Sequence, residues 1–301
     1  MNRHEPDWSL YRSFLAVLTE GSLSGAARAL GLTQPTLARH IDTLEQAVGF
    51  ELFVRSQAGL SPTDGALALK PYAEDLSRTA AAMLRAASGH GSAVAGTVRV
   101  TASETIGAEV LPPVFAELGE RHPELEIELV LSNTVDNLLR READIAVRMI
   151  EPAQDALVVR RIGTVTLGCY AHTRYLDRAG RPRTLHDLKR HSLVGFDRET
   201  PELRSLRRRV SEGYAGALDD IGFSFRTDSD LAQLMAIRAG VGIGICQAAL
   251  ARRTGDLERV LPKIFAFKLD VFLAMHEDLR STPRCRAVFD ALAAGLKSHV
   301  D

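Results

Sequence analysis

Residues Ser22 to Val48 read SLSGAARALGLTQPTLARHIDTLEQAV, and this stretch predicts two helices joined by a very short turn. Small and apolar residues recur at helical spacing until Gly31 interrupts them. Thr33 is then expected to cap a second helix with Pro35 in its first turn, where a missing N–H does no harm. This order is typical of a helix-turn-helix, whose second helix enters the major groove of DNA. An ordinary helical hairpin in an all-α core is the alternative.

The second of these helices is expected to have one apolar and one polar face. Its apolar stripe follows helical spacing and consists of Leu37, Ile41, Leu44 and Val48. The opposite side carries Pro35, Arg39, Asp42, Thr43 and Gln46. A DNA-binding role therefore requires Gln34 and Arg39 to project outward, with Arg39 suited to guanine and Gln34 to adenine.

A β-turn flap is predicted directly after the second helix. Residues 51–55 alternate like a short strand, residues 56–59 form a turn, and residues 60–63 lead into another helix. Such a flap is typical of a winged helix-turn-helix. Its Arg55 is placed to contact a phosphate or the minor groove.

Trp8 to Leu76 resembles the N-terminal domain of the LysR-type transcriptional regulators. The matching residues are FLAVLTEGSLSGAARALGLTQPTLARHIDTLEQAVGFELFVR and then SPTDGALAL. The resemblance implies DNA contacts from a set of polar and cap residues, namely Thr33, Gln34, Pro35, Thr36, Arg39 and Arg55. Many family members carry further basic residues in the wing, where this chain has Gln57, Ala58 and Gly59. Minor-groove reading by the wing is therefore left open.

Composition describes an ordinary globular protein with room for two or three compact units. The chain has 301 residues, of which 46% are apolar and 25% charged, and its net charge is −1. Bulk charge does not favour nucleic acid, so a DNA-binding role has to depend on where the arginines are placed.

Neither cofactor, metal site nor membrane segment is expected. Cys169, Cys246 and Cys285 are widely spaced, which predicts buried, inert thiols. The chain opens without the apolar core of a signal peptide and contains no apolar run of 18 residues, so we expect a cytoplasmic protein.

A long linker helix is predicted from Thr63 to about Ala87, with Pro71 bending or loosening its start. Apolar and small residues repeat in steps of three and four at Leu69, Tyr72, Leu76, Thr79, Met83 and Ala86. This pattern favours a partner helix in a dimer over packing on its own domain. Small residues at 88–93 predict a flexible hinge.

Beyond the hinge, strands alternate with helices, and the βαβαβ order of the first three strands predicts a parallel sheet with right-handed crossovers. Strands are expected over 97–102, 127–131, 144–148, 165–171, 193–196, 223–226, 241–246 and 266–274. Helices are expected over 106–121, 135–141, 185–189, 230–239 and 283–297, and the last strand and helix return to the first half. Two connections would then join two lobes, as in periplasmic-binding-protein folds.

The predicted architecture is thus α+β and multidomain: an N-terminal winged helix-turn-helix, a linker helix, and a two-lobed α/β effector domain like periplasmic binding proteins. Its limits are 1–62 for DNA binding, 63–90 for the linker helix and hinge, and 91–301 for the effector domain. Lobe 1 takes about 96–164 and 269–301, and lobe 2 about 165–268.

A ligand is expected where strands end, because loop amides and helix N-termini converge there. The candidates are polar or aromatic residues after five strands: Ser103, Thr105, Ser132, Asn133, Thr134, Arg148, Phe196 and Thr227. Hydroxyl groups and an arginine suit a carboxylate, and the resemblance implies an effector site at the same positions. Simple N-capping is the alternative for the Ser and Thr residues, and a surface ion pair is the alternative for Arg148.

These features favour a transcriptional regulator that binds double-stranded promoter DNA and a small, anionic effector. The resemblance implies a homodimer through the linker helix and a homotetramer, and contact with RNA polymerase is a further expectation. An α/β enzyme is the first rival, although no nucleophile, base or metal constellation occurs. A transport-type binding protein with an appended helical domain is the second. The glycines of GVGIG, residues 240–244, follow a helix and open a strand, which is the reverse of a phosphate loop.

Overall fold

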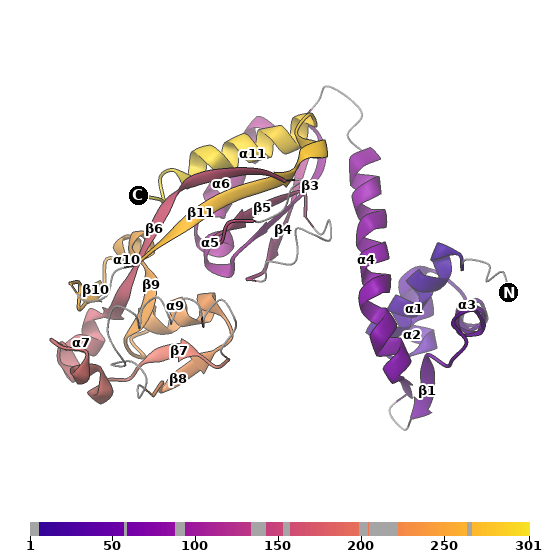
Figure 1. Ribbon diagram of the computed structural model, residues 1–301, viewed down its shortest axis with the longest axis horizontal. Coiled ribbons are helices and arrows are strands. Elements are labelled where there is room, and N and C mark those ends of the chain that lie inside the picture. The colour runs from indigo at the N-terminus through magenta and orange to yellow at the C-terminus, as the bar shows by residue number, and fades with distance from the viewer. Residues whose placement is uncertain are drawn as a thin grey trace. The chain divides into compact units, whose positions relative to one another are not determined.

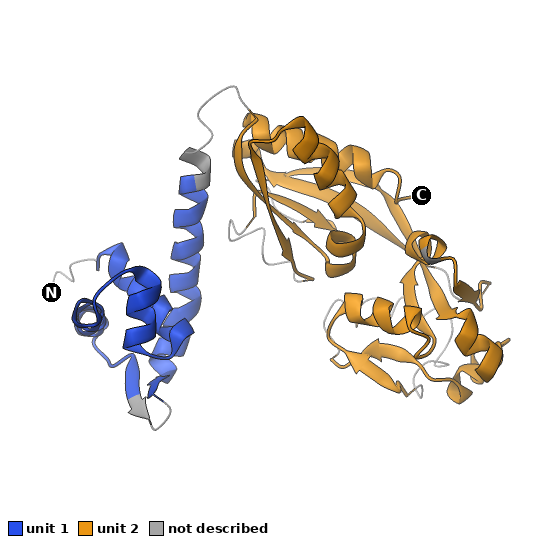
Figure 2. Ribbon diagram, turned by 180° about the vertical axis from the view of Figure 1, so that it is seen from behind, with its two compact units in different colours: residues 1–86 blue, residues 87–301 orange. Residues whose placement is uncertain are grey.

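The computed structural model describes residues 6–56, 59–87, 94–133, 143–152, 157–198, 204, 222–263 and 267–301. The chain divides into two compact units, Met1–Ala86 and Ala87–Asp301 (Figure 2). Several predicted features lie outside the described residues: the wing residues Gln57 and Ala58, the hinge over 88–93 with the domain limit at 90, Thr134, and the helix over 135–141.

Unit 1 is a small helical domain with a two-stranded wing. Its elements are α1 (Trp8–Glu20), α2 (Leu23–Leu30), α3 (Gln34–Val48), β1 (Phe53–Ser56), β2 (Gly59–Pro62) and α4 (Asp64–Ala87) (Figure 1). The turn between α2 and α3 is as short as expected, because α2 ends at Gly31 with a φ of 65° and α3 starts at its cap Thr33. The fully buried side chains of Phe14, Leu37 and Leu44 hold the helices together.

The wing contains one more strand than the sequence predicts. Strands β1 and β2 are antiparallel, with Phe53 opposite Pro62 and Ser56 opposite Gly59. Residues 60–62, predicted only as a lead into the next helix, thus form the second strand. Leu60 also donates its N–H to the carbonyl of Gly21 at 3.2 Å, which ties β2 to the turn between α1 and α2.

Helix α4 is continuous from Asp64 to Ala87, with Pro71 inside it. Its start packs on unit 1 through buried Ala66 and Ala73. Another side of α4 carries Tyr72, Leu76 and Met83, which are exposed at 69%, 46% and 68% of their surface, so this apolar face has no cover from the described residues of unit 1.

Unit 2 is built on one mixed seven-stranded sheet in the order β10-β6-β11-β5-β3-β4, with β9 also paired to β6. The strands are β3 (Gly96–Ala102), β4 (Leu125–Leu131), β5 (Ile145–Arg148), β6 (Leu157–His172), β9 (Gly244–Gln247), β10 (Leu257–Val260) and β11 (Phe267–His276). Strands β3, β4 and β5 are parallel, whereas β11 runs antiparallel to both β5 and β6. The parallel sheet predicted for the first three strands is therefore confirmed in β3, β4 and β5. Strands β7 (Val194–Phe196) and β8 (Phe225–Thr227) form a separate parallel pair.

The elements of unit 2 gather into two groups joined by the long strands β6 and β11 (Figure 1). Group I contains β3, β4 and β5 with α5 (Glu104–Glu109), α6 (Leu111–Arg121) and α11 (Pro283–Leu296). Group II contains β7–β10 with α7 (Thr173–Ala179), α9 (Asp230–Arg238) and α10 (Ala248–Thr254). Short 3₁₀ turns occupy His186–Arg190 and Glu277–Leu279. The last strand and helix return to group I, as expected.

One predicted helix is in fact two. The sequence predicts a single helix over 106–121, but α5 ends at Glu109 and α6 starts at Leu111. The cause is the pair Pro112 and Pro113, which have no N–H to donate to the carbonyls of the preceding turn. The strand predicted to open lobe 2 at 165 also differs, because β6 starts at Leu157 and passes through that boundary without a break.

Candidate functional site

The N-terminal half of α3 presents the residues that the sequence singled out for DNA. Thr33, Gln34, Pro35 and Arg39 are exposed, and Thr36 is half-buried. On the opposite flank Leu37, Ile41 and Leu44 are buried. The two-faced helix is therefore observed as predicted, and no described part of unit 1 covers its polar face.

The start of α3 is fixed by its own side chains. The Thr33 hydroxyl accepts a hydrogen bond from the N–H of Thr36 at 3.4 Å and lies 2.8 Å from the Thr36 hydroxyl. Pro35 has no N–H, and Leu37 donates its N–H to the Thr33 carbonyl at 3.0 Å, so the first turn of α3 is closed by its own groups. Arg55 lies in β1 opposite Leu60, but its side chain is outside the described set.

Sequence reasoning missed Glu45, which holds the wing against α3. Its Oε1 accepts hydrogen bonds from the N–H groups of Leu52 at 2.6 Å and Phe53 at 3.3 Å. Only the fold could reveal this contact, because an acidic residue late in a helix is usually solvated.

In unit 2, four predicted residues meet where β3 and β4 end. The N–H of Ser132 donates to the carbonyl of Ala102 at 2.9 Å, and Asn133 Oδ1 accepts from the N–H of Glu104 at 3.2 Å. The side-chain oxygen of Asn133 is thus already bound to the first residue of α5. Ser103 occupies the cap position of α5 but its hydroxyl makes no capping bond, and Thr105 is buried in the first turn. The capping alternative is therefore wrong for Ser103.

Arg148 ends β5 and is only 5% exposed, so the surface ion pair considered for it is wrong. Its Nη2 donates to Thr101 Oγ1 at 2.9 Å and its Nη1 to the carbonyl of Val147 at 3.1 Å. Its Nε is buried without a partner, and no carboxylate among the described residues pairs with it. Burial lowers the pKa of Arg148 to about 10, which still leaves the side chain cationic at neutral pH.

Phe196 and Thr227 are brought together in group II, where they face each other across β7 and β8. Thr227 Oγ1 accepts from the N–H of Ser229 at 3.2 Å. The Ser229 hydroxyl then donates to Glu104 Oε2 at 2.6 Å, and Glu104 also accepts from the N–H of Leu231 at 3.4 Å. Through Glu104 the two sets of strand-end residues belong to one connected region.

A second contact between the groups lies at the other end of α5. Arg238 of α9 binds Glu109 with both terminal nitrogens, at 2.6 and 2.7 Å. The bidentate hydrogen bond from Arg238 lowers the pKa of Glu109. Arg253 of α10 adds a hydrogen bond to the Glu109 carbonyl at 3.0 Å. Glu104 and Glu109 escaped sequence reasoning because their partners lie more than a hundred residues away.

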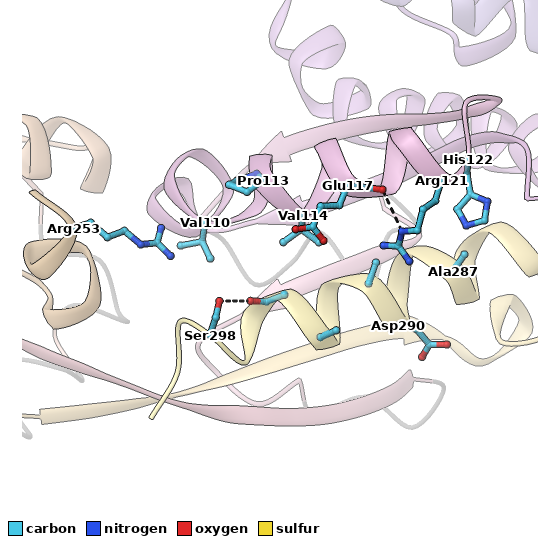
Figure 3. Close-up of a pocket in the computed structure, with 13 residues that line it drawn as sticks. Val110, Pro113, Val114, Glu117, Arg121, His122, Arg253, Ala287, Asp290 and Ser298 are labelled. Carbon is cyan, nitrogen blue, oxygen red and sulfur yellow. Dashed lines mark hydrogen bonds between the residues drawn. The ribbon is translucent and has the colours of Figure 1, made fainter.

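A groove of about 550 Å³ runs between α6 and α11 (Figure 3). Its floor is formed by small and apolar side chains that include Val110, Val114, Ala291 and Gly295. None of the predicted effector residues lines it. The groove is therefore not the site that the sequence predicts.

The three cysteines are buried, as expected. Burial raises the pKa of the Cys169 thiol and of the Cys246 thiol to about 12, which keeps both protonated and unreactive.

Within the described ranges, no three His, Cys, Asp or Glu side chains gather as a metal site. Nor does any helix in those ranges combine the length and apolar character needed to cross a membrane.

Two family models match the chain. One describes the LysR substrate binding domain and covers residues 91–297, and the other describes a bacterial regulatory helix-turn-helix protein of the lysR family and covers residues 8–67. The probable HTH-type transcriptional regulator LtrA of Klebsiella pneumoniae is 24% identical over 294 residues, which are 96% of this chain and 93% of LtrA.

Solved structures share the fold over nearly the whole length. CbnR, a LysR family transcriptional regulator, is 19% identical with a TM-score of 0.68, and the match covers 98% of this chain and 100% of CbnR. Full-length CbnR complexed with its target DNA is 20% identical with a TM-score of 0.65, covering 96% and 99% of the two chains. The names of these relatives denote transcriptional regulators and not enzymes.

Proposed function

The chain belongs to the LysR-type transcriptional regulators, and we propose that it binds promoter DNA as a dimer and alters those contacts when a small anionic effector binds unit 2. Its family supplies the coarse function, a DNA-binding regulator with an effector-binding domain. The contacts and the effector chemistry are argued from this chain's own residues.

The observation that carries the DNA-binding mode is the exposed polar face of α3 above a fully buried apolar flank. We infer that Arg39 reads a base, most naturally guanine, and that Gln34 is placed for adenine. Thr33, Pro35, Thr36 and Arg55 would position the phosphate backbone. In a dimer the two α3 helices would enter successive major grooves about one helical turn apart.

Substitution of Arg39 tests this mode. Arg39→Ala should weaken binding to a duplex selected in vitro by the wild-type protein by about 1–3 kcal/mol and relax its sequence preference. Gln46→Ala, on the same exposed face but near the end of α3, is the matched control and should change binding little. Equal loss on random DNA would reduce Arg39 to a phosphate contact.

Arg148 supports an anionic effector. A buried guanidinium with an unpaired Nε can bind a carboxylate without losing water at that position, because it has already been desolvated. The uncapped Ser103 hydroxyl would supply a second donor, and Thr105, Ser132, Asn133, Phe196 and Thr227 would line the remainder of the site. An effector held there would lie beside the Glu104–Ser229 contact between α5 and α9 and could alter how groups I and II meet.

Thermal unfolding with matched pairs of small carboxylic acids and their amides tests the effector chemistry. Acids that bind should raise the melting temperature of the wild type while their amides do not. The double variant Ser103→Ala, Arg148→Ala should lose that rise yet still bind DNA. Arg99→Ala removes a half-buried arginine of β3 that pairs with Glu128 and is the control. A retained response in the double variant would place the pocket elsewhere.

We further propose the functional limits 1–62, 63–90 and 91–301, with lobe 1 over about 96–164 and 269–301 and lobe 2 over about 165–268. The exposed apolar face of α4 supports a homodimer. Membership of the family supports a homotetramer, in which two dimers would associate through unit 2. Promoter binding implies a cytoplasmic location and brings RNA polymerase within reach as a partner.

A further inference from the structure

The base of the wing is held from the recognition helix by one carboxylate. Glu45 Oε1 accepts the N–H groups of both Leu52 and Phe53, at 2.6 and 3.3 Å. Leu52 is completely buried, so if the carboxylate is removed its N–H cannot form a replacement hydrogen bond with bulk water. A carboxylate acceptor makes a stronger hydrogen bond than a neutral one, which fixes where β1 leaves α3.

The same short segment is held from the linker helix by Thr63. The N–H of Thr63 donates to the Leu52 carbonyl at 3.0 Å, and its hydroxyl donates to the Glu51 carbonyl at 2.9 Å. That hydroxyl also accepts from the N–H of Ala66 at 3.1 Å and so caps the start of α4. Residues 51–53 are therefore bound at once by the last turns of α3 and by the first residues of α4.

We propose that Glu45 and Thr63 are positioning residues for DNA recognition, which make α3, the wing and the start of α4 one body. Neither needs to touch DNA. A rotation of α4, such as a dimer would undergo when its effector domains rearrange, would carry the wing and the recognition helix with it. This inference rests on the proposed DNA contacts of α3 and the wing.

The wing keeps a second attachment that makes the proposal testable. Strand β2 is tied to the turn between α1 and α2 through Leu60 and Gly21, independently of Glu45. Loss of the Glu45 carboxylate should therefore free the start of β1 without unfolding unit 1. The apolar core under α3, with buried Leu37 and Leu44, does not include Glu45.

The experiment compares Glu45→Ala and Glu45→Gln, and Thr63→Val and Thr63→Ser, in the full-length protein. Gln keeps an acceptor oxygen and Ser keeps the hydroxyl, so these two variants should behave like the wild type. Glu51→Ala, which removes an exposed carboxylate one residue before Leu52, is the matched control for charge. The probe is a duplex selected by the wild-type protein from random sequences, followed by hydroxyl-radical cleavage of its backbone and by methylation of guanine N7.

Glu45→Ala and Thr63→Val should each bind the duplex about tenfold less tightly, because each variant loses a hydrogen bond that holds the base of the wing. They should lose protection of the flanking backbone that the wing covers while guanine protection at the centre of each half-site persists. Hydrogen exchange at the Leu52 and Phe53 amides should quicken in Glu45→Ala even without DNA. The Gln and Ser variants should restore all three readings.

Unchanged flanking protection in both Glu45→Ala and Thr63→Val would overturn the inference. So would a parallel loss of central and flanking protection that follows only the fraction of folded protein, since that marks a purely structural role. A wild-type protein that protects no guanines would instead defeat the proposed DNA-binding mode, and the inference with it. Faster exchange of the Leu52 and Phe53 amides in Glu45→Ala without DNA distinguishes the two failures, because it concerns unit 1 alone.

Discussion

The Asp230 carboxyl group lies in an environment that disfavours its charged form. It sits half-buried in the first turn of α9, next to Ser229, whose hydroxyl is bound to Glu104 of α5. No hydrogen-bond donor among the described residues reaches the Asp230 carboxylate. Burial, and secondarily the negative charge of Glu104, raises the pKa of Asp230 to about 6.

The contribution of Asp230 to the stability of the protein should therefore fall as pH rises through this range. The folded-state pKa of about 6 exceeds the ordinary value of 3.8, so the unfolded chain gives up the proton more readily. The contribution is fully present below about pH 4 and is lost as pH passes 6. Between pH 5 and 7.5 we expect Asp230 to cost about 1 kcal/mol of unfolding free energy.

Urea unfolding of the wild type and of Asp230→Asn at about pH 5 and at about pH 7.5 separates the contribution of Asp230 to the unfolding free energy from that of the other titratable groups. The free energy of unfolding of Asp230→Asn, relative to that of the wild type, should increase as pH rises. Asp228→Asn, an exposed neighbour two residues earlier, should show the wild-type difference between the two pH values. Identical pH dependence in wild type and Asp230→Asn would contradict the assignment.

Residue roles that follow from local helical geometry could be predicted from the sequence, and those that depend on distant partners could not. Thr33, Gln34 and Arg39 face solvent because α3 alternates its faces at a spacing that can be read along the chain. Glu45 and Glu104 bind backbone or side chains brought near by folding, and nothing in their neighbours signals it. Arg148 was selected for its place at a strand end, but its burial depends on packing that the sequence does not show.

At the scale of elements, the crossing of α6 and α11 sets how closely group I can pack. Gly295 of α11 lies against Val114 of α6, and a Cβ at Gly295 would come within 2.3 Å of Val114 Cγ2. Val114 projects from α6 toward α11 at this point (Figure 3). The close approach depends on the missing side chain.

Gly295→Ala should therefore destabilise the protein by about 1–3 kcal/mol, the usual effect of overpacking a close contact. Gly119 of α6 is the matched control, because a Cβ there would meet nothing within 4 Å. Gly119→Ala should stabilise by about 0.5–1 kcal/mol through the better helix propensity of alanine. Chemical unfolding of both variants checks the pair, and a stabilising Gly295→Ala would show that α6 can move away without penalty.

Strand and helix positions were largely predictable, whereas strand pairing was not. Runs such as 97–102 and 144–148 carry the apolar residues of buried strands, and both form strands in the structure. The direction of β11 depends on where the chain returns from group II, which no local pattern encodes. The break between α5 and α6 was missed because the apolar period continues across Pro112 and Pro113.

At the scale of the whole molecule, α4 carries the surface that we propose for dimerisation. This helix exposes Tyr72, Leu76 and Met83 on one side, an apolar row that a monomer would leave in water. Side chains four and seven residues apart on one face are arranged for a second helix of the same kind. We propose that two α4 helices pack along this row, so dimerisation sets the distance between the two α3 helices.

A charge placed in that row should separate the protomers. Met83→Glu and Tyr72→Glu would each have to bury a carboxylate against apolar side chains, which costs several kcal/mol unless it stays protonated. Ala81→Glu adds the same charge on the opposite, exposed side of α4 and is the control. Sedimentation velocity over a range of concentrations should show monomers for the first two variants and the wild-type species for Ala81→Glu. Because a monomer binds one half-site only, operator affinity at low protein concentration should fall at least tenfold in the same two variants. If Met83→Glu and Tyr72→Glu sediment like the wild type, the dimer is held by another surface and α4 is only a spacer.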